Sequence, residues 1–392
     1  MASNPTWHWR ALVGLTVLTL AAGFLLPKVA VAPDLQEKRV LATLPAPMAR
    51  LGDFDDYRKE LDAYVADQFP ARPFLIGWLS AARLPFGISG TDRVLIGKQG
   101  WMFYDNDTHL GAARNDPPID AVGARQALNA LAGRTEYLRQ RGIKYLMVSP
   151  PQKEAVYPEM APYWFKASPS RAAMVLPSDA KASAAGDLLY LYESMREPAQ
   201  SSLKLFSRHD THWSGLGAYY GYVGMMNRLE SMGIGDGPRP LSDFQPKPIV
   251  PWGPRDLSLM LGVSSFVRFE YQEYSDRPIE GHLTTTYLGA DHSWTGPQVI
   301  DTGLVGKPVL LMTRDSFSNA LMPFLYGHFS RLILAHNQDG AWREDLINQY
   351  HPDVVVIEVI ESGILPSLAE GPPPTQDAKA RNDAVVKARF PS

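Results

Sequence analysis

Four short apolar runs constrain the fold of this chain more than any other feature, because each has the length and residue types of a buried β-strand. Three of them lie in the last quarter of the chain, where helix-like segments separate them. Strands joined by single helices form a parallel sheet with right-handed crossovers. The sequence therefore predicts an α/β domain built on a parallel sheet. The runs cover residues 143–149, 309–313, 332–335 and 354–360.

The segments between these runs show apolar residues at helical spacing. One of them ends in Arg141-Gly142, a basic last turn followed by a glycine, which is typical of a helix C-terminus. Two other segments have strand signals: one resembles a β-hairpin with a glycine-containing turn, and one alternates apolar and polar residues. The expected helices are 53–69, 121–141, 178–198, 217–232, 317–329 and 341–350, and the strand signals fall at 94–104 and 266–274.

Composition shifts divide the chain into five parts. A segment rich in glycine, proline and aromatic residues interrupts the main domain, and we expect it to form loops and strands at the rim of a cleft. The expected parts are an anchor or signal peptide at 1–32, a helical linker at 33–90, the main domain at 91–370 with the inserted segment at 234–300, and a flexible tail at 371–392, either disordered or a loose helix.

The N-terminus carries an uninterrupted apolar or small stretch, residues 11–26, which is short for a membrane span and long for the apolar core of a signal peptide. Ala30-Val31-Ala32 resembles a cleavage site, but Pro33 follows it and would hinder cleavage. We predict an uncleaved signal anchor. A cleaved signal peptide and a buried N-terminal helix remain alternatives. Either a signal anchor or a signal peptide would export the rest of the chain.

Composition excludes several classes of function. The 392 residues carry a net charge of −3 and no basic block, so nucleic-acid binding is not expected. The chain has no cysteine, which excludes disulfides and thiolate metal sites. A nucleophile in this chain would therefore be a serine or threonine hydroxyl.

The residues best suited to chemistry lie in Arg208–Gly215, where Asp210 and His212 are two positions apart. A carboxylate beside an imidazole is the orienting half of a nucleophilic triad. Ser316 is the best candidate for the hydroxyl, because it follows an apolar strand at the start of an expected helix, where its own N–H and the helix amides could stabilise an oxyanion. The alternative is that Asp315 or Ser316 only caps that helix.

Other readings of the polar residues stay open. A metal site could combine His209, Asp210 and His212 with His282 and His292, although no metal-binding spacing supports it. Trp213 is either a packing residue or a platform for a sugar ring.

Lys153 and Glu154 lie just past the carboxyl end of the first strand, where open α/β sheets bind ligands. Their alternative is an exposed loop pair.

The chain resembles the alginate-type exopolysaccharide O-acetyltransferases, the family of AlgJ, AlgX and the cellulose acetylation proteins, which carry an SGNH-hydrolase-like domain. The order and spacing of several short pieces carry this resemblance. They are residues 94–104, Pro151-Gln152-Lys153 with Tyr157-Pro158-Glu159, Asp210-Thr211-His212-Trp213, Asp256-Leu257 before Met260-Leu261-Gly262, Asp315-Ser316-Phe317-Ser318, and 352–356 running to Glu358 and Glu361.

The resemblance implies an SGNH-hydrolase-like three-layer domain in which Ser316 is the nucleophile, His212 the base and Asp210 its orienting acid. Arg314 stands where the family usually has glycine, and the usual oxyanion donors are not recognisable. The candidates for substrate or oxyanion contacts are Trp213, Arg314, Asn337, Lys153 and Tyr157. The chain is more similar to the membrane-anchored AlgJ type than to AlgX, because no room remains after residue 370 for a carbohydrate-binding module.

The implied function is transfer of acetyl groups to an exopolysaccharide such as alginate or cellulose, through an acetyl-serine. An acetyl-polysaccharide esterase with the same triad and a non-catalytic polysaccharide-binding scaffold are the alternatives. The resemblance implies no cofactor or metal, a multi-spanning membrane O-acyltransferase as acetyl donor, and other exopolysaccharide secretion components as partners. It places the protein in the periplasm, anchored in the inner membrane by residues 11–26.

Overall fold

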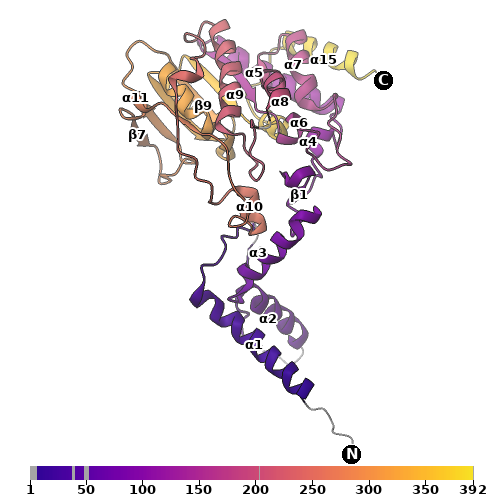
Figure 1. Ribbon diagram of the computed structural model, residues 1–392. Coiled ribbons are helices and arrows are strands. Elements are labelled where there is room, and N and C mark those ends of the chain that lie inside the picture. Colours follow the sequence, from indigo (N-terminus) through magenta and orange to yellow (C-terminus); the bar gives the residue numbers. More distant parts are fainter. Residues whose placement is uncertain (1–6, 38–39, 48–52, 203, 392) are drawn as a thin grey trace, which may run out of the picture. The chain divides into compact units, whose positions relative to one another are not determined.

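The computed structural model describes residues 7–37, 40–47, 53–202 and 204–391, and the chain forms two compact units (Figure 1). The first unit combines residues 1–96 with 251–269, and the second combines 97–250 with 270–392. The borders between the units follow residues 96, 250 and 269, whereas the boundaries expected from the sequence lie at residues 90, 234 and 300. The inserted segment is therefore divided between the two units.

The first unit is mainly helical. Its helices are α1 (Trp7–Val29), α2 (Phe54–Gln68), α3 (Arg72–Arg83) and α10 (Asp256–Leu261), and it ends its first segment with strand β1 (Val94–Ile96). Helices α3 and α10 pack together.

Helix α1 contains the expected anchor, residues 11–26. Within the part of the chain that the structure describes, no single helix is long and apolar enough to span a membrane. Two segments of α1, Trp7–Leu18 and Gly23–Val29, meet that requirement only as a pair bent by 45°.

The second unit is built on a seven-stranded sheet in the order β4-β3-β11-β9-β10-β8-β7. The first five strands are parallel, which confirms the parallel sheet predicted from the four apolar runs, and β8 and β7 add an antiparallel edge. The strands are β3 (Lys144–Ser149), β4 (Leu188–Tyr190), β7 (Thr284–Tyr287), β8 (Gln298–Asp301), β9 (Val309–Arg314), β10 (Arg331–His336) and β11 (Val354–Glu358).

Both faces of the central strands are buried, since neighbouring positions such as Tyr145 and Leu146 point to opposite faces and both lie in the core. One face packs against helices α5 (Ala121–Arg139), α7 (Ala172–Ser183) and α15 (Gln376–Arg389), which lie side by side (Figure 1). The continuous apolar runs in the sequence reflect this two-sided burial.

Helix α15 corrects the expectation of a flexible tail at 371–392. Thr375 caps the helix by accepting a hydrogen bond from the Ala378 N–H, and Ala378, Asn382 and Val386 are buried against the second unit. The polar composition of the segment concealed this narrow stripe of residues at helical spacing.

Two predicted helices are wrong in their bounds. The helix expected at 178–198 is divided into α7 and α8 (Tyr192–Ser201), because Ala184 and Gly186 have positive φ values of 54° and 146° and the chain turns there into β4. The helix expected at 317–329 consists of three short pieces: the 3-10 turn Ser316–Ala320, α12 (Met322–Leu325) and the 3-10 turn Tyr326–His328.

The inserted segment contains more regular structure than expected. It supplies β7 and most of β8 to the main sheet, together with the short antiparallel pair β5 (Gln245–Pro246) and β6 (Tyr274–Ser275). The strand expected at 266–274 is wrong except at its last residue. Other elements are β2 (Met102–Tyr104), α4 (Gly111–Arg114), α6 (Lys153–Val156), α9 (Gly215–Ser231), α11 (Arg277–Glu280), α13 (Glu344–Tyr350), α14 (Ile364–Ser367) and 3-10 turns at Leu84–Phe86, Lys98–Gly100, Leu241–Asp243, Asn337–Asp339 and Glu361–Gly363.

Candidate active site

Residues 205–214, named here the Asp-x-His loop, form a narrow turn of antiparallel backbone. The Ser214 N–H donates to the Leu205 carbonyl at 2.9 Å, and Phe206 and Trp213 form a β-bridge. The two sides of the loop thus hold each other, and Asp210 and His212 lie near its tip. Ser214 also caps α9, because its hydroxyl accepts from the Gly217 N–H at 3.1 Å.

The small residues after the loop allow α9 to begin directly against it. A Cβ atom at Gly217 would collide with the Leu205 carbonyl oxygen, and one at Gly221 would lie 2.7 Å from the Trp213 ring. The glycines in this run therefore explain how a loop with two imidazoles and an indole packs closely on its own following helix.

The structure brings Ser316, His212 and Asp210 into one hydrogen-bonded relay. His212 Nε2 lies 2.7 Å from Ser316 Oγ, and His212 Nδ1 lies 2.6 Å from Asp210 Oδ1. The His212 backbone N–H also donates to Asp210 Oδ1 at 3.0 Å, which fixes the acid against the imidazole. Ser316 and His212 are both partly exposed, so a substrate can reach them. This order of hydroxyl, imidazole and carboxylate is suited to nucleophilic catalysis.

The turn that carries Ser316 is held by two acids behind it. Asp315 Oδ1 accepts from the Phe317 N–H at 2.9 Å, and Asp315 Oδ2 accepts from the Ile360 N–H at 2.7 Å. Glu358, at the end of β11, accepts from the Asp315 N–H at 3.1 Å. Burial raises the pKa values of both carboxyl groups. Asp315 therefore caps the turn, and Ser316 is not needed for that role.

Sequence reasoning assigned no role to Glu358. Its signal was present, because it is an acid that directly follows the strongly apolar run Val354–Ile357 at the last position of a buried strand. An ionisable residue in such a place needs a specific partner.

Lys153 supports the Asp-x-His loop from below. Its side chain is buried, and Nζ donates to the carbonyl oxygens of Ser207 at 2.9 Å and Asp210 at 2.7 Å. The exposed-loop reading is wrong for Lys153 and for its neighbour Glu154, which is buried too. Burial raises the pKa of Glu154 to about 8. Lys153 positions the loop and is not placed to touch a substrate.

Tyr157 is also a supporting residue. It is fully buried, its hydroxyl donates to the Ser202 carbonyl at 2.6 Å, and it accepts from the Leu205 N–H at 3.1 Å. These bonds fix the start of the Asp-x-His loop. The expectation that Tyr157 contacts the substrate is therefore corrected.

Trp213 is a packing residue, which corrects its reading as a sugar platform. Only 4% of the residue is exposed, its ring packs edge-on against Phe317, and its Nε1–H donates to the Phe317 carbonyl at 2.9 Å. The indole thus ties the Asp-x-His loop to the turn that follows Ser316.

If the protein has the acetyl-transfer activity that the resemblance implies, Trp213→Phe is expected to lower transfer to a sugar and hydrolysis of a small acetyl ester by the same factor, roughly tenfold, because it removes one buried hydrogen bond that aligns two halves of the site. Both rates are measured on one preparation. A loss of transfer alone would restore the sugar-platform reading.

Arg314 and Asn337 were expected to contact the substrate or an oxyanion, but their hydrogen bonds go to other residues. Arg314 is buried, and its guanidinium donates to Asn319 Oδ1 at 3.0 Å and to the Trp294 carbonyl at 2.8 Å. Its bonds to Ser318 and Asn319 hold the residues that follow Ser316. Asn337 donates its side-chain amide to the Glu358 carbonyl at 2.6 Å. Among the described residues, no hydrogen bond joins Asn337 to Ser316.

Two residues of the metal alternative, His212 and His292, have other partners in the structure. Both ring nitrogens of His212 are engaged by Asp210 and Ser316. His292 stacks on Tyr287, with ring centroids 4.7 Å apart. A metal ion on His212 would have to replace its contact with Asp210 or with Ser316.

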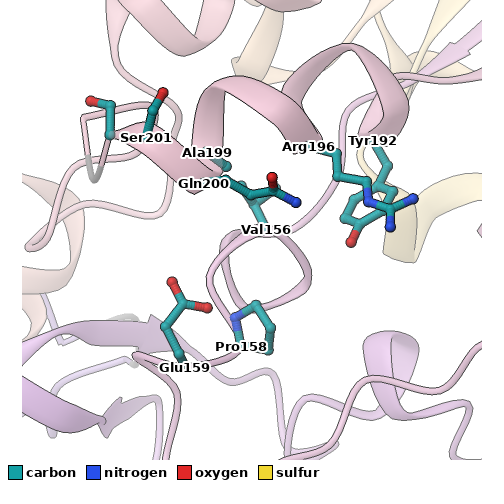
Figure 2. Close-up of a pocket in the computed structure, with 9 residues that line it drawn as sticks. Val156, Pro158, Glu159, Tyr192, Arg196, Ala199, Gln200 and Ser201 are labelled. Carbon is teal, nitrogen blue, oxygen red and sulfur yellow. The ribbon is translucent and has the colours of Figure 1, made fainter.

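A cavity of about 600 Å³ lies beside Tyr157 and is lined by its neighbours Val156 and Pro158 and by its hydrogen-bond partner Ser202 (Figure 2). Figure 2 shows Pro158 and Glu159 on one side of it and Arg196 and Gln200 on the other. Its wall contains charged, amide and hydroxyl groups together with one tyrosine. The lining residues are Val156, Pro158, Glu159, Tyr192, Arg196, Ala199, Gln200, Ser201 and Ser202.

Comparisons with known proteins relate part of this chain to one family and its fold to solved structures. Residues 94–278, just under half of the chain, match the family model described as SGNH hydrolase-like domain, acetyltransferase AlgX. That range includes Asp210 and His212 and ends before Ser316. The probable alginate O-acetylase AlgJ of Pseudomonas aeruginosa is 31% identical over 160 residues. The match covers 40% of this chain and 38% of that relative, so it spans well under half of the relative's length.

The fold is similar to that of PatB1 from Bacillus cereus, whose structure with a sulfonyl adduct aligns with a TM-score of 0.56 and 14% identity. The alignment covers 73% of this chain and 99% of PatB1. A PatB1 structure without mention of the adduct aligns with a TM-score of 0.53 over 71% of this chain and 99% of PatB1, also at 14% identity. At this identity the likeness concerns the fold. Over the matched residues the chain is thus similar to an SGNH hydrolase-like acetyltransferase domain of the AlgX type and to the probable alginate O-acetylase AlgJ.

Proposed function

We propose that the protein transfers acetyl groups to hydroxyls of an exopolysaccharide through an acetylated Ser316. The relay of Ser316, His212 and Asp210, with its two distances of 2.7 and 2.6 Å, is the observation that carries this proposal. The similarity to the AlgX family model and to AlgJ supports the choice of acetyl groups and of a polysaccharide acceptor.

The first half of the reaction acetylates the enzyme. His212 Nε2 takes the proton of Ser316 Oγ, and Oγ forms a bond to the carbonyl carbon of the acetyl donor. As the tetrahedral intermediate collapses, His212 returns the proton to the leaving oxygen of the donor. Asp210 holds the imidazole with its Nδ1–H toward the acid and stabilises the imidazolium.

The second half repeats these steps with a sugar hydroxyl. His212 removes the proton of that hydroxyl, its oxygen bonds to the acetyl carbon, and Ser316 leaves and regains a proton from His212. The proposal extends to export into the periplasm with α1 as membrane anchor, and to a membrane-bound acyltransferase that supplies the acetyl group, with other secretion components nearby. It needs no cofactor or metal.

The test is acetyl transfer by the purified protein from an activated acetyl ester to candidate oligosaccharides, followed by mass spectrometry of the sugars. Acetylated sugar that forms only with intact Ser316 supports the transferase. Ready hydrolysis of acetylated polymer without any transfer would favour an esterase. If a correctly folded protein catalyses neither transfer nor hydrolysis, the binding-scaffold alternative is favoured.

We also propose that the cavity in Figure 2 holds the acceptor chain. Its volume lies in the range of small-molecule sites. The mixture of hydrogen-bond donors and acceptors, with Arg196 and Glu159 of opposite charge, suits a polyhydroxylated ligand of low charge. Tyr157 connects the cavity to the Asp-x-His loop, because its hydroxyl donates to the Ser202 carbonyl in the wall and accepts from the Leu205 N–H at the start of the loop.

The double variant Arg196→Ala/Gln200→Ala is expected to raise KM for the oligosaccharide roughly tenfold, through the loss of hydrogen bonds to the acceptor. Hydrolysis of a small acetyl ester should not change, since neither residue touches the relay. Gln140→Ala, which removes an exposed glutamine just after α5, is the matched control. An unchanged KM in the double variant would place the acceptor elsewhere.

A further inference from the structure

Two acids, Asp315 and Glu358, lie directly behind the proposed nucleophile. They follow or end neighbouring parallel strands, since β9 and β11 pair from Leu310 with Val354 to Thr313 with Ile357. This register brings both acids to the carboxyl edge of the sheet. Glu358 is fully buried, whereas Asp315 is half-buried beside Ser316.

The two carboxyl groups accept different numbers of hydrogen bonds from the protein. Asp315 accepts two backbone N–H groups, from Phe317 and Ile360, so a negative charge on it is compensated. Glu358 Oε2 accepts one, from Asp315 itself. Glu358 Oε1 is buried and, counted as an acceptor, has no hydrogen-bond donor among the described residues. The charge therefore belongs on Asp315.

The surrounding charges do not compensate a second carboxylate. Arg314 on β9 is the cation that acts on Glu358, but its guanidinium is bonded to Ser318, Asn319 and the Trp294 carbonyl. His212, in the relay, and His336, at the end of β10, interact electrostatically with Asp315. Two adjacent buried carboxylates repel each other, and one of them retains its proton.

We propose that Glu358 is a neutral carboxylic acid whose O–H donates to Asp315, and that this pair positions Ser316. Asp315 then joins the Ser316 turn to the backbone just after β11, at Ile360, while Asn337 fixes the Glu358 carbonyl. The neutral form also keeps a second negative charge away from the place where an oxyanion develops. The positioning part of this inference rests on the proposed function, whereas the protonation of Glu358 does not.

The pKa values agree with this arrangement in direction. Burial and the adjacent Asp315 carboxyl raise the pKa of Glu358 well above its ordinary value, and the hydrogen bond between the two side chains raises it further. The same hydrogen bond lowers the pKa of Asp315, against the larger effect of its burial.

The sign of the pH dependence follows from linkage. With a raised pKa, folded Glu358 keeps a proton that the unfolded chain releases above a pKa of about 4.3. Folding stability from this group therefore falls as the pH rises from that value toward the folded pKa. Glu358→Gln has the same shape and cannot ionise, so this slope disappears.

Thermal and denaturant unfolding of wild type and Glu358→Gln, from about pH 5 to pH 8, tests the protonation state. The ratio of the two unfolding constants is expected to change in favour of the variant by up to tenfold per pH unit. A ratio that stays constant across this range would show that Glu358 is ionised in the folded protein, and the inference would fail.

Kinetics of Glu358→Gln and Glu358→Ala test the positioning role. The glutamine variant is expected to keep kcat within roughly threefold, while the alanine variant loses about 10²-fold in kcat with little change in KM, as for a misplaced nucleophile. Equal loss in both variants would mean that an ionisable group is required, and a fully active alanine variant would remove the positioning role. Ser316→Ala is measured in parallel, so failure of the acetyl chemistry itself is recognised separately.

Discussion

Ser316→Ala is expected to abolish both acetyl transfer and acetyl-ester hydrolysis, because the variant removes the only atom that can bond to the acetyl carbon in the proposed relay. His212→Ala should be equally inactive, and Asp210→Asn should lose about 10⁴-fold, since the imidazole loses its orienting acid. Turnover is measured with an activated acetyl ester, with and without oligosaccharide.

Stability separates a chemical loss from a folding defect. Ser316 and His212 are partly exposed, so their alanine variants should unfold at nearly the wild-type temperature. Ser231→Ala, at the exposed end of α9, is a control for the loss of a serine hydroxyl and should keep full activity. Wild-type turnover in Ser316→Ala would contradict the assignment of the nucleophile.

Lys153→Met is expected to lower both stability and activity, which distinguishes it from the relay variants. Methionine preserves the apolar stem but leaves the Ser207 and Asp210 carbonyl groups buried without their donor. The free energy of unfolding should fall by about 2–4 kcal/mol. The Asp210–His212 geometry should loosen as well, with a loss of kcat of about 10²-fold.

Lys144→Met is the matched control for this change, because Lys144 is exposed at the start of β3. It should alter neither stability by more than about 0.5 kcal/mol nor turnover. If Lys153→Met leaves kcat unchanged while it destabilises the protein, Lys153 supports the fold without positioning the Asp-x-His loop for chemistry.

The sheet and the residues of the relay could be predicted from the sequence because their signals are local. A β-strand buried on both faces must be apolar throughout, and the runs at 143–149, 309–313, 332–335 and 354–360 are. The Asp-x-His spacing and the serine after a strand are equally visible. Their meeting within 2.7 Å depends on strand order, which no local pattern determines.

The supporting residues could not be assigned because burial of a polar side chain is not visible in one sequence. Lys153, Tyr157 and Arg314 look like exposed, substrate-binding groups, yet each is buried and bonded to backbone. Trp213 could be read either way from the sequence, because its Nε1–H donates to the carbonyl of Phe317, a residue 104 positions away. These errors have one cause. Hydrogen-bond partners that are distant in the sequence allow a polar side chain to be buried.

The elements placed wrongly show the same limit for backbone structure. The helical pattern over 178–198 continues through Gly186, whose φ of 146° lets the chain enter β4. Helix α15 forms from a polar segment because three of its residues meet α5 and α7. Tertiary packing decided both cases against local preference.

The most direct test of the account is the site of acetylation. Wild-type protein is mixed with an activated acetyl ester, quenched in acid and digested, and the peptide that contains Ser316 is analysed by mass spectrometry. The account predicts one acetyl group on Ser316, which disappears when an oligosaccharide acceptor is added before the quench and is absent in Ser316→Ala. Turnover of the ester with Ser316 unmodified at every time point, or with the acetyl group on another residue that the acceptor discharges, would contradict it.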